Sequence, residues 1–210
     1  MKHAAVGFRV HSGWTAMIAL AIAKGSPAVL VRRRVNLVQT FTYKFRQPYH
    51  TAEKLPLEEA RAFVARVRSE ARRLARRAVR ELKTELRDQG YLLTGFGLLL
   101  SSGRPLPAFA KILAAHSLIH TADGELFREA LLHAAARNGL NPVAIRERDL
   151  TDSASRALRR KPADLAQRIS DLGRPLGPPW SQDEKFAALV AWLAATPSPK
   201  SHLSQGREGR

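Results

Sequence analysis

Cysteine is absent from the 210 residues, so the chain has no disulfide bond, no thiol nucleophile and no cysteine ligand for zinc. Long hydrophobic runs are missing too: the longest, residues 14–23, has about half of the ~20 residues that a membrane-spanning helix needs. We therefore expect a soluble, cytoplasmic protein without a membrane partner. The GxSxG and SxxK patterns of covalent hydrolases and the lysine-containing phosphate loop do not occur either.

Acidic side chains are scarce relative to basic ones, 18 against 35, which gives a formal net charge of +17. The imbalance is greatest in residues 1–56, which hold nine basic residues and one acidic residue. Such a field attracts polyanions, and nucleic acid is the commonest polyanion in the cytoplasm. Arginine outnumbers lysine 26 to 9 in an alanine-rich chain, so an origin of the excess in GC-rich codons alone stays open.

The first third of the chain has the pattern of an antiparallel meander. Three strand-like runs, residues 4–11, 14–23 and 28–38, are separated only by Ser12-Gly13 and by the turn at residues 24–27. The third run contains three consecutive arginines, which favours an edge strand with one face in water. Residues 40–54 follow as a polar connection.

The rest of the chain alternates helical and strand-like segments. Apolar residues spaced by three and four predict one long helix over residues 57–89, and residues 91–100 read as a buried strand whose two glycines indicate close approach of another backbone or a bulge. We expect helix over residues 107–120 and 123–138 with a break at 121–124, then a strand at 142–148. Residues 151–195 form a helical C-terminal part. The prediction is one domain over residues 1–195 and a disordered tail over residues 196–210.

This order of elements resembles that of the ribonuclease H-like superfamily, without a shared sequence motif. The resemblance implies an α/β fold with a mixed five-stranded sheet, in which the fourth and fifth strands pair parallel to the first. Members that cut nucleic acid hold two divalent metals with carboxylates, one from the first strand and another from the fourth. Residues 4–11 contain Arg9 and His11 but no acid, and residues 91–100 contain none. We therefore do not expect the standard two-metal nuclease site.

A histidine pair is the strongest candidate for chemistry. His116 and His120 are four residues apart, so on a helix both imidazoles project from one face and can share a metal. We take His116, His120 and Glu125 as candidate metal ligands, and add His11 for a candidate catalytic set. The HExxH pattern is missing, and polar packing or surface exposure of these histidines is the alternative. Asp123 is expected to cap a helix. The cofactor stays open, with a divalent metal as the one candidate.

A basic surface is the second candidate site, and aromatic residues 43, 45 and 49 interleave with it in a way that suits stacking on unpaired bases. Its residues are Arg32, Arg33, Arg34, Lys44, Arg46, Tyr49, Arg72, Arg76 and Arg80. The leading prediction is a nucleic-acid-binding module, with RNA or single-stranded DNA as the partner. The alternatives are a metal-dependent hydrolase or nuclease that uses the histidine and carboxylate cluster, and an assembly protein that binds a protein partner through the long helix.

Overall fold

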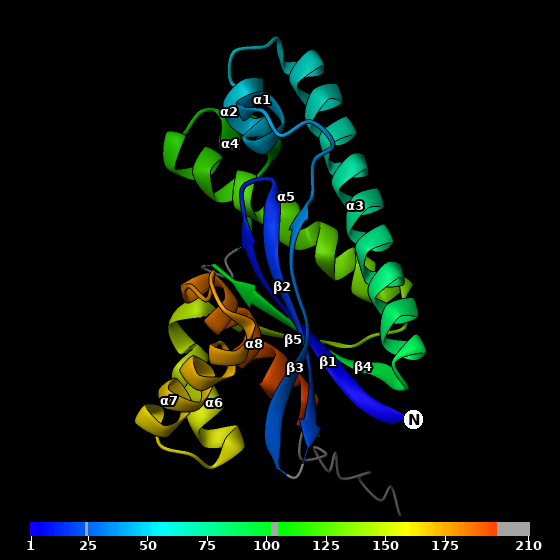
Figure 1. Ribbon diagram of the computed structural model, residues 1–210. Coiled ribbons are helices and arrows are strands. Elements are labelled where there is room, and N and C mark those ends of the chain that lie inside the picture. Colours follow the sequence, from blue (N-terminus) through cyan, green and yellow to red (C-terminus); the bar gives the residue numbers. More distant parts are fainter. Residues whose placement is uncertain (24, 102–104, 197–210) are drawn as a thin grey trace, which may run out of the picture.

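A mixed five-stranded sheet forms the centre of the computed structural model, which describes residues 1–23, 25–101 and 105–196. The strands lie in the order β3-β2-β1-β4-β5 (Figure 1). β1 pairs antiparallel with β2, and β2 with β3, whereas β4 is parallel to both β1 and β5. The meander, the edge position of the third strand and the parallel pairing of the fourth strand with the first are thus confirmed, whereas the fifth strand pairs with β4 and not with β1. The bounds of the strands are β1 Lys2–His11, β2 Trp14–Ala23, β3 Ser26–Asn36, β4 Tyr91–Leu100 and β5 Pro142–Arg146.

One face of the sheet is covered closely by α8 (Gln182–Ala195). Gly7 on β1 and both Gly95 and Gly97 on β4 face its backbone, and a Cβ atom at any of the three positions would overlap a carbonyl oxygen of that helix. The close approach inferred from the two β4 glycines is confirmed. Ser181 and Glu184 form a capping box that fixes where α8 begins.

The opposite face packs against α3 (Leu57–Asp88) and α5 (His116–Arg137). The predicted apolar stripe of α3 is buried, as at Val67, Ala71 and Leu82. On β1 the alternation of the strand sends Val6, Phe8 and Val10 to this side, and sends Arg9 toward α8. The two faces therefore have separate apolar cores, and β1 contributes to both sides.

Short helices pack at one end of the sheet around the start of α3 and α5, and we call this region the helical cap (Figure 1). It contains α1 (Tyr43–Arg46), α2 (Pro48–Ala52) and α4 (Phe109–Leu113). The polar connection expected over residues 40–54 is therefore wrong in part, because Pro48 sits at the first position of α2, where its fixed φ favours a helix.

The expected break at residues 121–124 is also wrong. α5 runs without interruption through Gly124, and the chain instead leaves helical geometry at Ala115, whose backbone is extended. Asp123 does not cap a helix, because its side chain is buried against α2. The residues around Asp123 have the local pattern of a helix cap, but its carboxylate is instead bonded to His50 and to the Tyr49 amide.

The C-terminal part is helical, as predicted. The elements are the 3₁₀ turn η1 (Glu147–Asp149), α6 (Leu150–Leu158), α7 (Pro162–Leu172), the 3₁₀ turn η2 (Arg174–Leu176) and α8. The fifth strand ends at Arg146, two residues earlier than predicted. The tail expected over residues 196–210 lies, from residue 197 on, outside the described residues. Among the described helices, none is both long and apolar enough to cross a membrane.

Candidate metal centre and nucleic-acid interface

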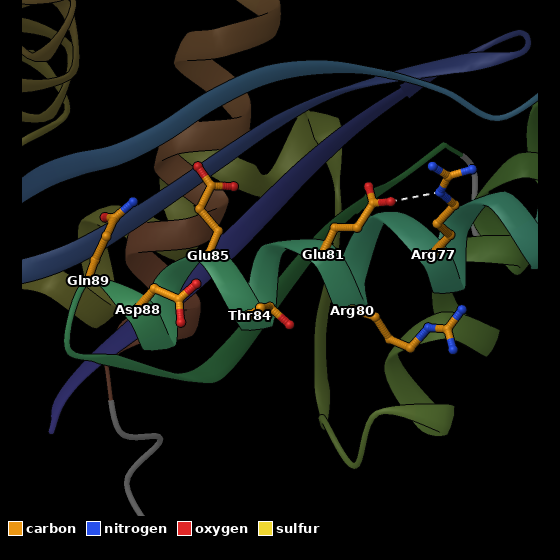
Figure 2. Close-up of a pocket in the computed structure, with 7 residues that line it drawn as sticks. All are labelled: Arg77, Arg80, Glu81, Thr84, Glu85, Asp88 and Gln89. Carbon is orange, nitrogen blue, oxygen red and sulfur yellow. Dashed lines mark hydrogen bonds and ion pairs between the residues drawn. The ribbon is translucent and has the colours of Figure 1, made fainter.

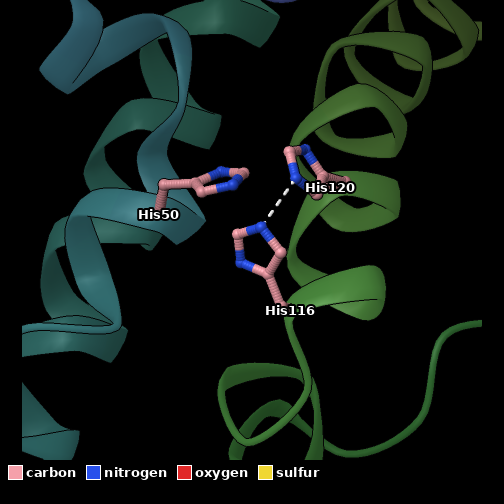
Figure 3. A group of neighbouring side chains, drawn as sticks. All are labelled: His50, His116 and His120. Atoms are coloured by element: carbon pink, nitrogen blue, oxygen red, sulfur yellow. Dashed lines mark hydrogen bonds between the residues drawn. The ribbon is translucent and has the colours of Figure 1, made fainter.

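Three histidines meet in the helical cap. His50 comes from α2, and His116 and His120 come from the first turns of α5 (Figure 3). One ligand nitrogen of each lies within 4.8 Å of the other two, and the Nε2 atoms of His116 and His120 are 3.0 Å apart. The ring of His50 is edge-on to both others, with centroids at 5.3 Å from His116 and 4.3 Å from His120.

A buried carboxylate holds His50 in place. Nδ1 of His50 lies 2.5 Å from one oxygen of Asp123, and the other oxygen accepts the backbone N–H of Tyr49 at 2.7 Å. Asp123 is 2% exposed. Burial raises the pKa of Asp123, and the hydrogen bonds from His50 and from the Tyr49 amide partly offset that rise. Because Nδ1 is bonded to Asp123, Nε2 is the nitrogen of His50 left to bind a ligand.

The arrangement offers three imidazole nitrogens and an oriented hydrogen-bond partner behind one of them. Imidazole suits zinc, copper and nickel, whereas magnesium prefers oxygen ligands. Of the residues predicted as ligands, the structure brings together His116 and His120.

Glu125 and His11 lie outside this cluster, which corrects their predicted place beside His116 and His120. Glu125 accepts hydrogen bonds from the Ser101 hydroxyl and from Arg128. Glu125 follows His116 by nine residues, so it leaves α5 on about the opposite side of the helix. His11 lies at the end of β1, where its Nε2 is 2.8 Å from Asp183. His50 lies in the segment read as a connection, near a loop end, and was not among the predicted ligands, although its convergence with the other histidines was an open question.

A second charged cluster surrounds Arg9 on the α8 side of the sheet. Its guanidinium bonds both carboxylate oxygens of Glu147, at 2.9 and 3.1 Å, and also bonds Asp183. The hydrogen bond with Glu147 raises the pKa of Arg9, so the cation is retained at any ordinary pH. His11 stacks on Trp14 beside this cluster, with ring centroids 4.3 Å apart.

These residues do not fit the two-magnesium site that the fold is known for. β1 and β4 carry no carboxylate. The two acids that approach β1, Glu147 and Asp183, are already bonded to the guanidinium of Arg9. The positive charge beside these two carboxylates is thus that of Arg9.

The middle of α3 carries a one-sided arginine surface. Between residues 60 and 80 there are eight arginines and one acid, Glu70, whereas the other acids of the helix lie at its two ends. Four of these arginines are exposed and have no hydrogen bond or ion pair to any residue that the structure describes. They are Arg66, Arg73, Arg76 and Arg80, and we call them the α3 arginine face.

The predicted basic surface divides into free and engaged residues. Arg76 and Arg80 belong to the α3 arginine face. Arg33 is paired with Glu85 at 2.9 Å, and Arg72 grips Glu129 with Nε and one terminal nitrogen at 2.5 to 3.0 Å. Arg32 donates to the carbonyls of residues 176, 177 and 179, so part of its hydrogen-bonding capacity is used within the chain.

Fewer aromatic side chains of the predicted surface are available than the sequence suggested. Tyr49 is 3% exposed and accepts a hydrogen bond from Arg68 at 3.0 Å, so it cannot stack on a base. Burial raises the pKa of its hydroxyl, which stays protonated at neutral pH. Tyr43 is 59% exposed and remains available. Lys44 lies over the ring of Phe45, and both Arg34 and Arg46 lie over the ring of Phe41.

Two adjoining hollows run beside α3, each of about 380 Å³, and share Tyr49, Arg68 and Leu106 in their walls. Arg61 and Arg72 line their far ends. A larger open hollow of about 750 Å³ lies at the other end of α3, lined by Glu81, Glu85 and Asp88 together with Arg77 and Arg80, and Arg77 donates to Glu81 there (Figure 2). Glu125 and Glu129 also line one of the two smaller hollows, so acidic and basic side chains meet at both ends of α3.

Comparisons with known proteins bear on the fold. No protein-family model and no curated protein sequence matches the chain. A solved structure of Thermus thermophilus RuvC in complex with a Holliday junction substrate has a TM-score of 0.54 and 12% identity, over 92% of this chain and 93% of that chain. Another Thermus thermophilus RuvC structure has a TM-score of 0.49 and 13% identity over the same shares. The first likeness confirms the ribonuclease H-like fold.

Proposed function

We propose that the protein binds nucleic acid through the α3 arginine face, without the two-magnesium chemistry associated with its fold. The observation that carries this proposal is the eight-to-one excess of arginine over acid between residues 60 and 80. Four of those arginines have no hydrogen bond or ion pair within the described ranges, so their charge is available to phosphates. The RuvC structure named for its complex with a Holliday junction supports a nucleic-acid role on the same fold.

Single-stranded RNA or DNA is the partner that we propose. The exposed ring of Tyr43 belongs to the helical cap, which packs beside the first turns of α3. An exposed aromatic ring beside a basic surface stacks on unpaired bases, which a duplex does not offer. Contacts to phosphates alone would give no sequence preference.

Salt titration of a labelled oligonucleotide tests this proposal. We expect the double variant Arg76→Gln/Arg80→Gln to lower the slope of log affinity against log salt by about 1.4 for a single strand, and to weaken binding roughly tenfold at physiological salt. Fluorescence anisotropy with single-stranded RNA, single-stranded DNA and a duplex of equal length measures both quantities.

The matched control changes the charge by the same amount elsewhere. Arg148 and Arg174 are exposed, with side-chain exposures of 73% and 75%, and lie in η1 and η2. Arg148→Gln/Arg174→Gln should bind as the wild type does. Equal losses in both double variants would assign binding to net charge alone, and no binding near physiological salt would eliminate the function. A preference for the duplex would overturn the choice of single strands.

One observation favours a second candidate function, metal-dependent hydrolysis. Three imidazoles on one cation leave a coordination position for water. Such a water would add its oxygen to a phosphorus atom of the nucleic acid while the ester oxygen leaves with a proton. Cleavage of the same oligonucleotides by the zinc-loaded protein, lost in His116→Ala, is the expected result; intact oligonucleotides would leave binding as the function.

The structure argues against the third alternative, assembly through the apolar stripe of the long helix. That stripe would have to be available to a partner. Ala60, Val64, Ala75 and Leu86 on it are all at most 1% exposed within the single chain.

A further inference from the structure

We propose that His50, His116 and His120 bind one transition-metal ion, of the zinc class, and leave its fourth position open to solvent. This site lies in the helical cap and shares no residue with the α3 arginine face, so the proposal does not rest on nucleic-acid binding, although the ring of Tyr43 lies 6.4 Å from that of His50. Its ligand set adds His50 to the two histidines that the sequence pattern predicts, and omits Glu125.

The distances between the nitrogens suit one small cation. Two imidazole ligands on tetrahedral zinc, at 2.0–2.1 Å each, are separated by about 3.3 Å. The Nε2 atoms of His116 and His120 are 3.0 Å apart, and all three ligand atoms fit within 4.8 Å. Small rotations of the imidazoles therefore bring three nitrogens onto one ion.

The backbone presents these ligands in a fixed way. His116 and His120 share one face of α5 because they are four residues apart. His50 reaches them from α2, whose packing against α5 buries it to 7% exposure. His116 and His120 are exposed, so the site opens toward solvent on the α5 side. A water molecule or an anion can take the fourth position from that side.

Asp123 supplies the second, independent observation. Its buried carboxylate is bonded to Nδ1 of His50, and the backbone amide of Tyr49 holds the other oxygen. Metal-binding histidines in proteins usually have such a carboxylate behind them, which fixes the tautomer and turns Nε2 toward the ion. The carboxylate also offsets part of the positive charge that a divalent cation brings.

The donor set selects the class of metal. Three nitrogen ligands favour zinc, cobalt, nickel or copper over magnesium and calcium, which prefer oxygen. Zinc and cobalt are therefore suitable probes, and magnesium is the negative control. Cobalt also reports its own geometry through its visible absorption.

Titration of the metal-free full-length chain with Co²⁺ or Zn²⁺ tests the proposal, in the absence of nucleic acid and of any affinity tag. We expect one equivalent to bind, with a tetrahedral Co²⁺ spectrum that Zn²⁺ abolishes and excess Mg²⁺ does not. His116→Ala and His120→Ala change exposed side chains, so they should fold, and should weaken binding at least 100-fold. His133→Ala, on the same helix but outside the cluster, should bind as the wild type does.

Asp123→Asn tests how His50 is oriented. An asparagine amide would donate to Nδ1 and place the imidazole proton on Nε2, which blocks that nitrogen as a ligand. We expect affinity to fall 10- to 100-fold while one equivalent still binds. No binding of either metal by the wild type, or an equal loss in His133→Ala, would overturn the proposal. Arg76→Gln/Arg80→Gln should leave metal binding unchanged, which separates this site from the nucleic-acid surface.

Discussion

The two histidine-containing clusters of this molecule differ in which cation their carboxylates receive. Beside β1, the acids Glu147 and Asp183 are bonded to Arg9, so the chain itself provides the positive charge. In the helical cap, Asp123 is bonded to a histidine, and three imidazole nitrogens face one another. A guanidinium only donates hydrogen bonds, whereas a neutral imidazole keeps a lone pair for a metal. The carboxylates beside β1 thus already have a cation from the chain, whereas the histidines of the helical cap keep nitrogen atoms that can bind a metal.

Removing Arg9 should have the largest effect on stability. Arg9→Met leaves two carboxylates without their cation, and the Arg9 side chain is 18% exposed, so we expect a loss of about 3 kcal/mol in the free energy of unfolding. Urea denaturation measures this loss. Arg148→Met removes an exposed arginine and should change stability by less than about 0.5 kcal/mol. An Arg9 variant as stable as the wild type would show that its ion pairs contribute little.

Zinc should stabilise the helical cap and not the β1 cluster. At a zinc concentration of about 100 times Kd, a single site raises the free energy of unfolding by about 2.7 kcal/mol. We expect His11→Ala to keep this gain in full and His120→Ala to lose it, as measured by urea unfolding with and without zinc. If His11→Ala lost the zinc-dependent stabilisation, the metal would bind beside β1 and not in the helical cap.

His11 itself should contribute the smallest of the three effects. It bonds Asp183 at 2.8 Å and stacks on Trp14, but its side chain is 33% exposed. We expect His11→Ala to lower the free energy of unfolding by about 1 kcal/mol. A loss as large as that of Arg9→Met would mean that the histidine, and not the guanidinium, holds the cluster together.

Much of the fold could be predicted from the sequence because its signals are local. The glycine turns, the apolar runs and the helical stripe of residues 57–89 depend on neighbours in the chain, and they predicted the strands and the long helix, whereas the parallel pairing in the sheet was implied by the resemblance. The errors in the helical cap have one cause. Asp123 has the local pattern of a helix cap, but its partner is His50, 73 residues away, and only tertiary packing decides between the two.

The candidate sites could be predicted only in part, for a related reason. The spacing of His116 and His120 identifies a shared helix face, whereas His50 joins them through the contact between α2 and α5. The arginines show the same limit. Arg32 and Arg76 look equivalent in the sequence, but the first points at backbone carbonyls of η2 and the second at solvent.

The missing side chains at Gly7, Gly95 and Gly97 have an effect far beyond their own size. At these three positions the backbone of α8 lies directly against β1 and β4, with no side chain of the strand between them. Asp183, in the first turn of α8, is therefore held at a fixed height above Arg9. A methyl group added at one of these glycines would push α8 away from the sheet and so separate Asp183 from Arg9. The three glycines therefore maintain the ion pair between the helix and the sheet.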